Sequence, residues 1–432
     1  MALPSRANGA FGHIDLSSQR PVNCSQSVVR SDLRAIIRQG DSMRKPSTNQ
    51  RISMSAHAAQ WLMPVIAAAL MAPVASLAAQ DFNARAGSSV TLGGRVQAQF
   101  EASSSTESPS SFFIRRAWIT ADGRLNDLVS GRLQFDANGN KVLEAYLAFT
   151  PSDRFRMELG QFKRAISTFW LAANFDLPLI ERDGRVPGSD PCPGVGNVCS
   201  FGRLTGGLGL DAYEPGILMS GRLSDKVGFR VTVTNGEGIN GKDTNSAKST
   251  STRLTFNLDS NNRLHTYAVF DETADGVGGT LWAPAYALEY ELGTWRRGPH
   301  LVVNAATGRN WRAEAASEYG DSEVSFFAFQ AMGLWYLPIE GDGAFEAIEP
   351  LFRVSWASTQ TGDSLFEGDI VVNDDVKGLV ITPGFMLYAT GRTGISTNLD
   401  IYTSSRTVAG SNYESMSFDP EWSLKMQAFV AF

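Results

Sequence analysis

The sequence predicts an all-β protein: a 16-stranded antiparallel transmembrane β-barrel whose long third extracellular loop folds into the lumen. Three observations support this fold class. Segments of about ten residues alternate between apolar and polar side chains, there are sixteen of them, and short turns alternate with longer connections. Because successive side chains of a strand point to opposite faces, one face of such a barrel meets lipid and the other a wet lumen.

The last segment, Glu421 to Phe432, shows the alternation most clearly. One set of alternate residues is wholly apolar, namely Trp422, Leu424, Met426, Ala428, Val430 and Phe432. The other set is mostly polar, namely Glu421, Ser423, Lys425, Gln427, Phe429 and Ala431. A soluble sandwich could also contain one such strand, so the prediction depends on repetition along the chain.

The other segments repeat the pattern and carry Arg, Glu, Gln or Asp in mid-strand. In the segment 89–101, for example, Arg95 and Gln97 oppose Val96 and Ala98. Polar residues inside so many strands indicate a polar interior instead of a packed core. The predicted strands are 89–101, 111–123, 127–137, 141–150, 154–163, 213–223, 226–235, 250–259, 263–272, 283–293, 298–307, 323–337, 345–358, 378–390, 394–404 and 420–432.

The connections between these strands fall into two alternating classes. The short class, rich in turn-forming residues, comprises 124–126, 151–153, 224–225, 260–262, 294–297, 341–343 and 391–393. The longer class comprises 102–110, 164–212, 236–249, 273–282, 308–322, 359–377 and 405–419, with 138–140 as a short exception. Short turns on one rim and long loops on the other are typical of an outer-membrane barrel with both termini in the periplasm.

The N-terminal residues indicate export. Residues 1–42 show no clear period, and we expect an unstructured or misassigned extension there. Residues 43–79 are predicted to be a signal peptide, because bases precede the apolar run 61–79 and small residues near Ala78 and Ala79 suit cleavage. An N-terminal membrane anchor is the alternative. Residues 80–432 then form the outer-membrane barrel.

The charge of the mature chain argues against a nucleic-acid partner. From Gln80 onward there are 30 basic and 41 acidic residues, a formal charge of −11. Proteins that bind nucleic acid usually show a basic balance.

Two cysteines remain in this mature part. Cys192 and Cys199 are seven residues apart in a Gly/Pro-rich loop of an exported chain, which favours a local disulfide. A metal pair is the weaker alternative, because no histidine lies nearby in the sequence.

The longest predicted loop, 164–212, is too long for a plain connection in a compact barrel. We expect it to fold back into the lumen. Arg182 and Arg185, next to Glu181 and Asp183, could form a constriction in which opposed charges impose a transverse field. A solvated surface loop is the alternative.

Five short motifs, in this order and at this spacing, resemble the phosphate-selective porin O and P family: Phe113–Ala117, Asp136, Glu144–Leu147, Leu159–Lys163 and Leu179–Arg182. The resemblance implies a homotrimer of 16-stranded barrels in the outer membrane of a two-membrane bacterium, in contact with its lipids. It also implies passage of small polar or anionic solutes, especially phosphate. By the same resemblance, Phe432 is the barrel-assembly signal.

The chain departs from the lysine-rich pores of the family. It has seven lysines after Gln80, and Arg164-Ala165-Ile166 follows Lys163 where the family usually has a proline and an aromatic residue. Arginine could replace lysine as an anion binder. The candidates for constriction or anion binding are Lys163, Arg164, Arg182, Arg185, Arg116, Arg132 and Arg156. Strand parity adds Arg95, Arg230, Arg253 and Arg353 to the lumen, and it admits both Arg115 and Arg116 only if a bulge intervenes.

Two other functions are compatible with a barrel. An outer-membrane enzyme such as a lipase would need a nucleophile beside a base, for which His265 is the candidate. A structural or adhesive barrel would have a closed lumen. We expect a porin without enzymatic activity, cofactor or metal.

Overall fold

The computed structural model describes the residues that form the barrel. These are 80–85, 88–104, 110–164, 166–172, 177, 179–182, 200–243, 247–274, 280–315, 324–341, 343–360, 375–389, 393–408, 414–417 and 420–432. The predicted N-terminal extension and signal peptide, residues 1–79, lie outside the described residues.

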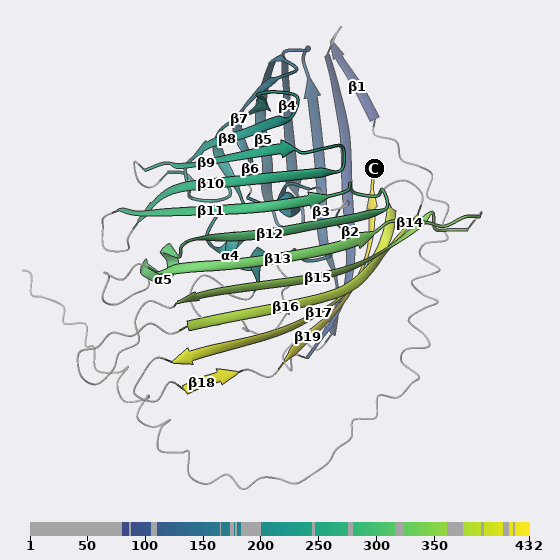
Figure 1. Cartoon of the computed structure of the whole chain (residues 1–432). Helices are drawn as coiled ribbons and strands as arrows, with labels where there is room; N and C mark the ends of the chain where they lie inside the picture. The colour runs from purple at the N-terminus through teal and green to yellow at the C-terminus, as the bar shows by residue number, and fades with distance from the viewer. Residues whose placement is uncertain are drawn as a thin grey trace, which may run out of the picture. The chain divides into compact units, whose positions relative to one another are not determined.

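Sixteen antiparallel strands close into a barrel, which confirms the predicted 16-stranded antiparallel β-barrel (Figure 1). Each strand pairs with the next along the chain, and the last pairs with the first. The strands of this circuit are β2 (Ser88–Ser103), β3 (Ser110–Arg124), β4 (Val129–Asp136), β5 (Lys141–Ser152), β6 (Phe155–Arg164), β7 (Ala212–Arg222), β8 (Val227–Thr234), β9 (Ser249–Asn257), β10 (Asn262–Ala274), β11 (Thr280–Leu292), β12 (Pro299–Arg309), β13 (Ser325–Trp335), β15 (Ala347–Gln360), β16 (Asp375–Tyr388), β17 (Thr393–Val408) and β19 (Glu421–Ala431).

Three further short strands extend this sheet. β1 (Gln80–Arg85) pairs with the start of β2. β14 (Leu337–Pro338) pairs with β15, and β18 (Glu414–Ser417) pairs with β17. Because β14 and β18 continue the pairing of β13 and β19 across short interruptions, they complete existing wall strands.

The seam of the barrel joins the two ends of the sheet. In β19, Met426 pairs with Phe100 of β2, and two backbone hydrogen bonds of 2.8 and 3.1 Å join Phe432 to Gly94. A Cβ atom on Gly94 would lie 2.6 Å from the Phe432 ring, so only a glycine at this position leaves room for the ring. Closing the seam removes the free strand edges on which chains otherwise aggregate.

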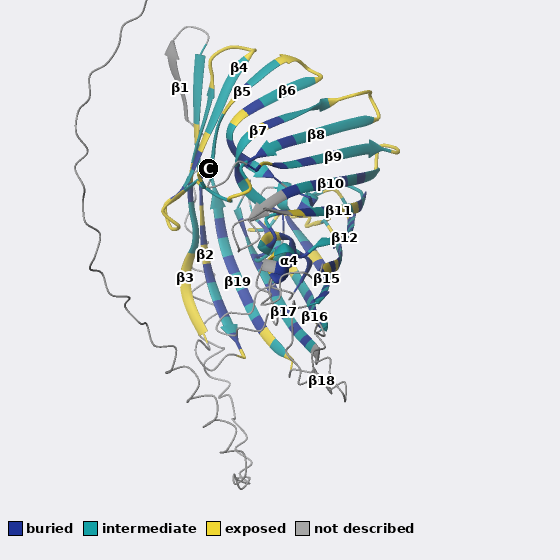
Figure 2. Ribbon diagram, turned by 90° about the vertical axis from the view of Figure 1, so that its left-hand side faces the viewer, coloured by how far each residue is buried: buried dark blue, intermediate teal, exposed yellow. Residues whose placement is uncertain are grey.

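The alternation predicted from the sequence is present in the strands. Figure 2 shows bands of different burial along the barrel strands. In β13 and β15, Phe327, Trp335 and Phe352 are exposed, whereas Gln330 and Arg353 are buried. The exposed residues are apolar and suit lipid, whereas the buried, inward-facing set includes polar residues such as Gln330 and Arg353 beside apolar ones such as Phe326 and Met332.

Among the described residues, the short turns near 124–126, 151–153, 224–225, 260–262 and 294–297 lie between the strands that the sequence predicts, and side chains stabilise two of them. Asn126 accepts hydrogen bonds from the backbone N–H groups of Leu128 and Val129, at 2.9 and 2.8 Å. Asp259 likewise accepts from the N–H groups of Asn261 and Asn262, at 2.8 and 2.9 Å. Such Asx turns favour tight links between strands.

Helix is scarce in the described part of the chain. It contains α3 (Thr168–Leu171), α4 (Phe201–Gly207) and α5 (Trp311–Ala315). None of these helices has the length and apolarity needed to cross a membrane.

Candidate functional site in the barrel lumen

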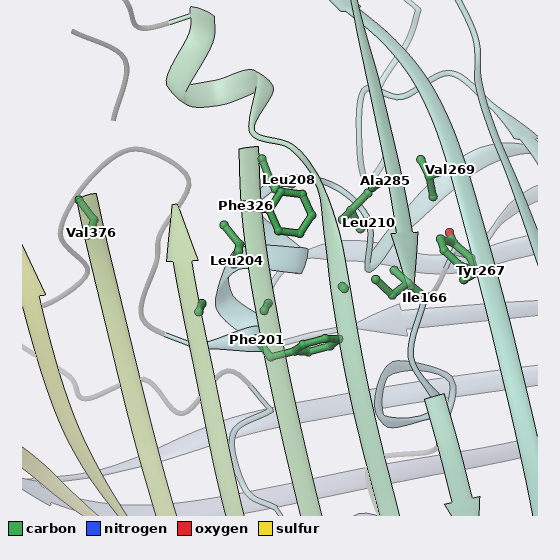
Figure 3. Packing of buried hydrophobic residues seen from close by; sticks show 13 residues of the cluster. Ile166, Phe201, Leu204, Leu208, Leu210, Tyr267, Val269, Ala285, Phe326 and Val376 are labelled. Atoms are coloured by element: carbon green, nitrogen blue, oxygen red, sulfur yellow. The ribbon is translucent and has the colours of Figure 1, made fainter. Parts of the chain in front are cut away.

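The helix α4 packs against the inner face of the wall. Ser200 caps its N-terminus by accepting from the N–H of Arg203 at 3.1 Å. Its apolar side chains Phe201 and Leu204 belong to one buried cluster with wall residues such as Phe326 and Val376 (Figure 3). These wall positions have the parity of the lumen, so the described residues around α4 occupy part of the barrel interior.

A second apolar cluster brings the segment around α3 to the same wall. Phe169, Leu177 and Leu179 pack against a set of wall residues. That set is Val302, Met332, Leu334 and Leu351.

Polar anchors fix both parts of the segment. Asn398 accepts from the N–H of Ile180 at 2.7 Å, and Ser355 accepts from the N–H of Phe201 at 3.0 Å. The fully buried Arg353 donates to the carbonyl oxygen of Arg182 at 2.7 Å. The described residues of this segment thus contact the inner wall, while the course of the whole loop 164–212 stays a prediction.

A bulge in β3 brings two adjacent arginines to one carboxylate. Gln97 pairs with Arg116 and Ala98 pairs with Ile114, which leaves Arg115 as the extra residue of the bulge. Arg115 makes a bidentate ion pair with Glu181, with one N–H···O distance of 3.0 Å, and Arg116 lies 3.7 Å from the same carboxylate. Two adjacent residues of a strand can both face the lumen only where a bulge intervenes, and the bulge is present.

Charge determines the protonation state of this carboxylate. Burial alone would raise the pKa of Glu181, but the positive charges of Arg116 and Arg115 outweigh it and hold the pKa at about 2. Glu181 is therefore a stable anion within a cationic cluster.

Arg182, next in the chain, is held mainly by backbone oxygens. Its Nε donates to the carbonyl of Phe169 and a terminal nitrogen donates to that of Ala172, both at 2.7 Å. Its guanidinium also lies over the ring of Trp170, 5.4 Å from the ring centre. Burial, followed by repulsion from Arg116, lowers the pKa of Arg182 to about 10, so it stays cationic at neutral pH.

Two cavities lie in the lumen around this cluster. The loop-side cavity, of about 510 Å³, is lined by Arg116, Glu181 and Arg182 among others. The turn-side cavity, of about 570 Å³, is lined by Lys163 and extends to Phe432. Trp118 lines both cavities, so its side chain lies between them.

The two cavities differ in charge. Six basic and three acidic residues line the loop-side cavity: Arg115, Arg116, Lys141, Arg182, Arg203, Arg312, Asp136, Glu181 and Asp211. Four basic and three acidic residues line the turn-side cavity: Arg95, Arg132, Lys163, Arg230, Asp122, Glu144 and Glu158. The excess of positive charge is therefore larger on the loop side.

Of the predicted site residues, Lys163, Arg182, Arg116 and Arg132 line these cavities. Lys163 donates to the carbonyl of Trp170 at 3.1 Å. Arg132 pairs with Asp122 at 2.7 Å and with Glu144 at 3.4 Å.

Two further candidates have partners in the wall. Arg164 is 1 % exposed and pairs with Asp271 at 2.5 Å, which gives it a structural role. Arg156 pairs with Glu158 at 2.7 Å. Neither belongs to the described lining of the two cavities. Arg185, Cys192 and Cys199 lie outside the described residues.

The aromatic residues of the lumen were not singled out from the sequence. Trp118, Trp170 and Tyr213 line the loop-side cavity. Trp118 follows Arg116 by two residues in β3, so strand parity alone could have placed it in the lumen. Trp170 lies in the predicted loop, where no strand period applies, and Tyr213 is the first residue of the predicted strand 213–223.

The two histidines after Gln80 share one carboxylate. His265 and His300 approach Glu291 at 3.3 and 3.0 Å. His265 also contacts the hydroxyl of Thr255 at 2.9 Å. Both histidines are buried, and neither is part of the described cavity linings. Within the described ranges, no group of three or more His, Cys, Asp or Glu residues is placed to hold a metal ion.

A closed 16-stranded barrel with an apolar outer face and a polar, hollow lumen is the architecture of an outer-membrane porin. The comparison with protein families agrees: residues 90–268 match the family model for phosphate-selective porin O and P. This match confirms the resemblance found in the sequence motifs.

Solved porins have a similar fold. The outer membrane channel DcaP of Acinetobacter baumannii has a TM-score of 0.50 at 12% identity, covering 82% of this chain and 100% of that one. The anion-selective porin from Comamonas acidovorans has a TM-score of 0.49 at 10% identity, covering 80% and 100%. OmpT of Vibrio cholerae, described as a trimer form, has a TM-score of 0.49 at 9% identity, with the same coverage. No curated protein matches the sequence.

Proposed function

We propose that this porin allows small solutes to cross the outer membrane by passive diffusion and favours anions, with phosphate among the candidate solutes. The observation that supports this preference most is the six basic against three acidic residues around the loop-side cavity. The chain after Gln80 is acidic as a whole, so this positive excess is local to the lumen. A cavity with low-dielectric walls concentrates ions of the opposite charge.

The filter of this pore consists of Arg116, Glu181 and Arg182. Arg116 and Arg182 attract anions, whereas Glu181 holds the arginines in place and sets a field across the lumen. Lys163 and Arg132 continue the positive lining on the turn side. We assign Arg185 to the same filter on sequence grounds.

The remaining sequence predictions complete this proposal. Residues 43–79 act as the signal peptide, and Cys192 and Cys199 form a local disulfide in the long loop. Phe432 acts in barrel assembly, for which its place on Gly94 at the seam is favourable. The functional unit is a homotrimer, as the family resemblance implies.

The test is the reversal potential of the purified channel in planar bilayers under a KCl gradient. The wild-type channel should favour chloride. Arg182→Gln should shift the potential toward cations, because it removes one of the positive charges that line the loop-side cavity. Arg222→Gln is the matched control: it removes the same charge from an exposed residue that pairs with Asp153 at the short-turn rim. An unchanged potential for Arg182→Gln would exclude this residue from the filter.

An enzymatic function is the second candidate, because Thr255, His265 and Glu291 form a hydroxyl, imidazole and carboxylate series. Its burial argues for a structural role, and the porin family match points to a channel. Ester hydrolysis by the refolded protein that disappears in His265→Ala would support the enzyme. If the protein conducts ions but hydrolyses no ester, the enzymatic function is excluded and the channel function stands.

A further inference from the structure

We propose that, among anions, this channel selects organic anions that carry a planar aromatic ring, such as benzoates, over aliphatic carboxylates and inorganic phosphate. The inference rests on the proposed anion preference and names the solute class of the same lumen. It follows from how the arginines of the filter are already bonded and from which surfaces of the filter are flat and apolar.

The arginines of the filter donate hydrogen bonds mainly to other groups of the protein. Arg182 donates to two backbone carbonyls at 2.7 Å. Arg115 donates to Glu181, and Arg116 donates to Gln97 at 3.1 Å. A compact, strongly hydrated ion such as phosphate needs several converging donors to replace its water. The filter therefore attracts anions through its positive charge and not through converging hydrogen-bond donors, so it does not favour phosphate over other anions.

Aromatic side chains line both cavities. Trp118 lines both cavities, so its ring borders each of them. Trp170 and Tyr213 lie edge to face in the loop-side lining, with ring centres 5.8 Å apart. Tyr146 lines the turn-side cavity. Rings of this kind favour a second ring in stacked or edge-to-face contact.

Positive charge and ring surface occur together in this lining. The guanidinium of Arg95 lies over Trp118, 4.5 Å from its ring centre, as that of Arg182 lies over Trp170. An aromatic carboxylate can place its ring against the tryptophan and its charge near the guanidinium at the same time. Acetate and phosphate satisfy only the charge. Cavities of about 510 and 570 Å³ are also within the range that holds small organic molecules.

The test measures how each anion blocks chloride current through the full-length mature channel in planar bilayers. We expect benzoate to block at about tenfold lower concentration than acetate, because one ring contact is worth about that factor. Inorganic phosphate should also block less well than benzoate. Trp118→Ala should remove most of the difference between benzoate and acetate, and Trp118→Phe should keep it because a ring remains. Trp335→Ala is the control, since this exposed tryptophan belongs to the apolar outer face of β13.

Three outcomes would overturn the inference: equal block by benzoate and acetate, tighter block by phosphate, or a benzoate preference that survives in both Trp118→Ala and Trp170→Ala. If the channel is chloride-selective but shows no benzoate preference, only the solute class fails. If its reversal potential is that of a cation channel, the proposed anion preference fails as well. If Trp118→Ala does not fold, the benzoate preference over acetate is compared between Trp118→Phe and Trp170→Ala. The inference then requires that Trp118→Phe keeps this preference and that Trp170→Ala reduces it.

Discussion

The charge of Glu181 opposes the proposed anion preference of the lumen, and its removal tests the electrostatic basis of that proposal. In Glu181→Gln the shape is kept while the only charge lost is one of three acidic charges around the loop-side cavity. A unit charge about 5 Å from a permeating ion in a water-like lumen changes its energy by about 0.8 kcal/mol. This corresponds to about a fourfold change in the local concentration of an ion.

Loss of this negative charge raises the local anion concentration and lowers the local cation concentration by about fourfold each, so we expect Glu181→Gln to raise the ratio of anion to cation permeability by about sixteenfold at low salt, and by less at high salt because of screening. The assay is the reversal potential under a tenfold KCl gradient, measured for the variant and for Asp153→Asn. The control removes a carboxylate of similar charge from an exposed turn, where its side chain is 79% accessible. A potential that stays constant, or moves toward cations, would refute the charge count of the cavity.

The same substitution has a structural consequence that a second measurement can separate. The pKa of Glu181 is held at about 2 instead of its ordinary 4.5, so the arginines stabilise its charged form by roughly 3 kcal/mol. Because the folded-state pKa is depressed, this contribution is complete above about pH 4.5 and is lost as the pH falls toward 2. At neutral pH Glu181→Gln loses it fully, and we expect noisier single-channel current as the loop anchor at Arg115 weakens. The melting of the barrel wall should change little.

Two further predictions follow from the cavity and the wall. Burial raises the pKa of Asp211 to about 6 despite hydrogen bonds from Thr205 and others, so its negative charge disappears as the pH falls through 6. Anion selectivity should then rise between pH 7 and pH 5, and Asp211→Asn should remove this pH dependence; a wild-type channel with constant selectivity over that range would contradict it. In the wall, Gly216→Ala would place a Cβ atom 2.1 Å from the carbonyl oxygen of Val233, whereas Gly123→Ala meets nothing within 4 Å. Overpacking costs about 1–3 kcal/mol, so only the first variant should lose its resistance to SDS at a lower temperature.

The fold could be predicted because its determinants are local. Strand alternation has a period of two, and turns have their own residue types, so both can be detected in short stretches of sequence. The predicted segment 394–404 and the observed β17, Thr393–Val408, differ only in how far the strand extends. The residues of β17 outside the predicted segment lie beyond the polar-apolar alternation from which that segment was predicted.

The site depends instead on pairings between distant residues. Arg164 lies in a motif that favours a pore residue, but its partner Asp271 is 107 positions away and draws it into the wall. The bulge at Arg115 depends on the register between β2 and β3, which no single segment encodes. Trp118 suits either face of a barrel strand by residue type, and it is placed in the lumen by its parity with Arg116, which the register with Gln97 and Arg95 preserves.

These pairings explain how an acidic chain can hold a positive pore. Arginines in the wall, such as Arg164 and Arg253, are neutralised one to one by Asp271 and Glu289. At the filter, in contrast, Glu181 is shared by Arg115 and Arg116, while Arg182 is bonded to neutral carbonyl oxygens. Carbonyl partners fix a guanidinium without cancelling its charge. The sign of the pore field is therefore set by which arginines receive carboxylates, and net charge along the sequence carries no information on that choice.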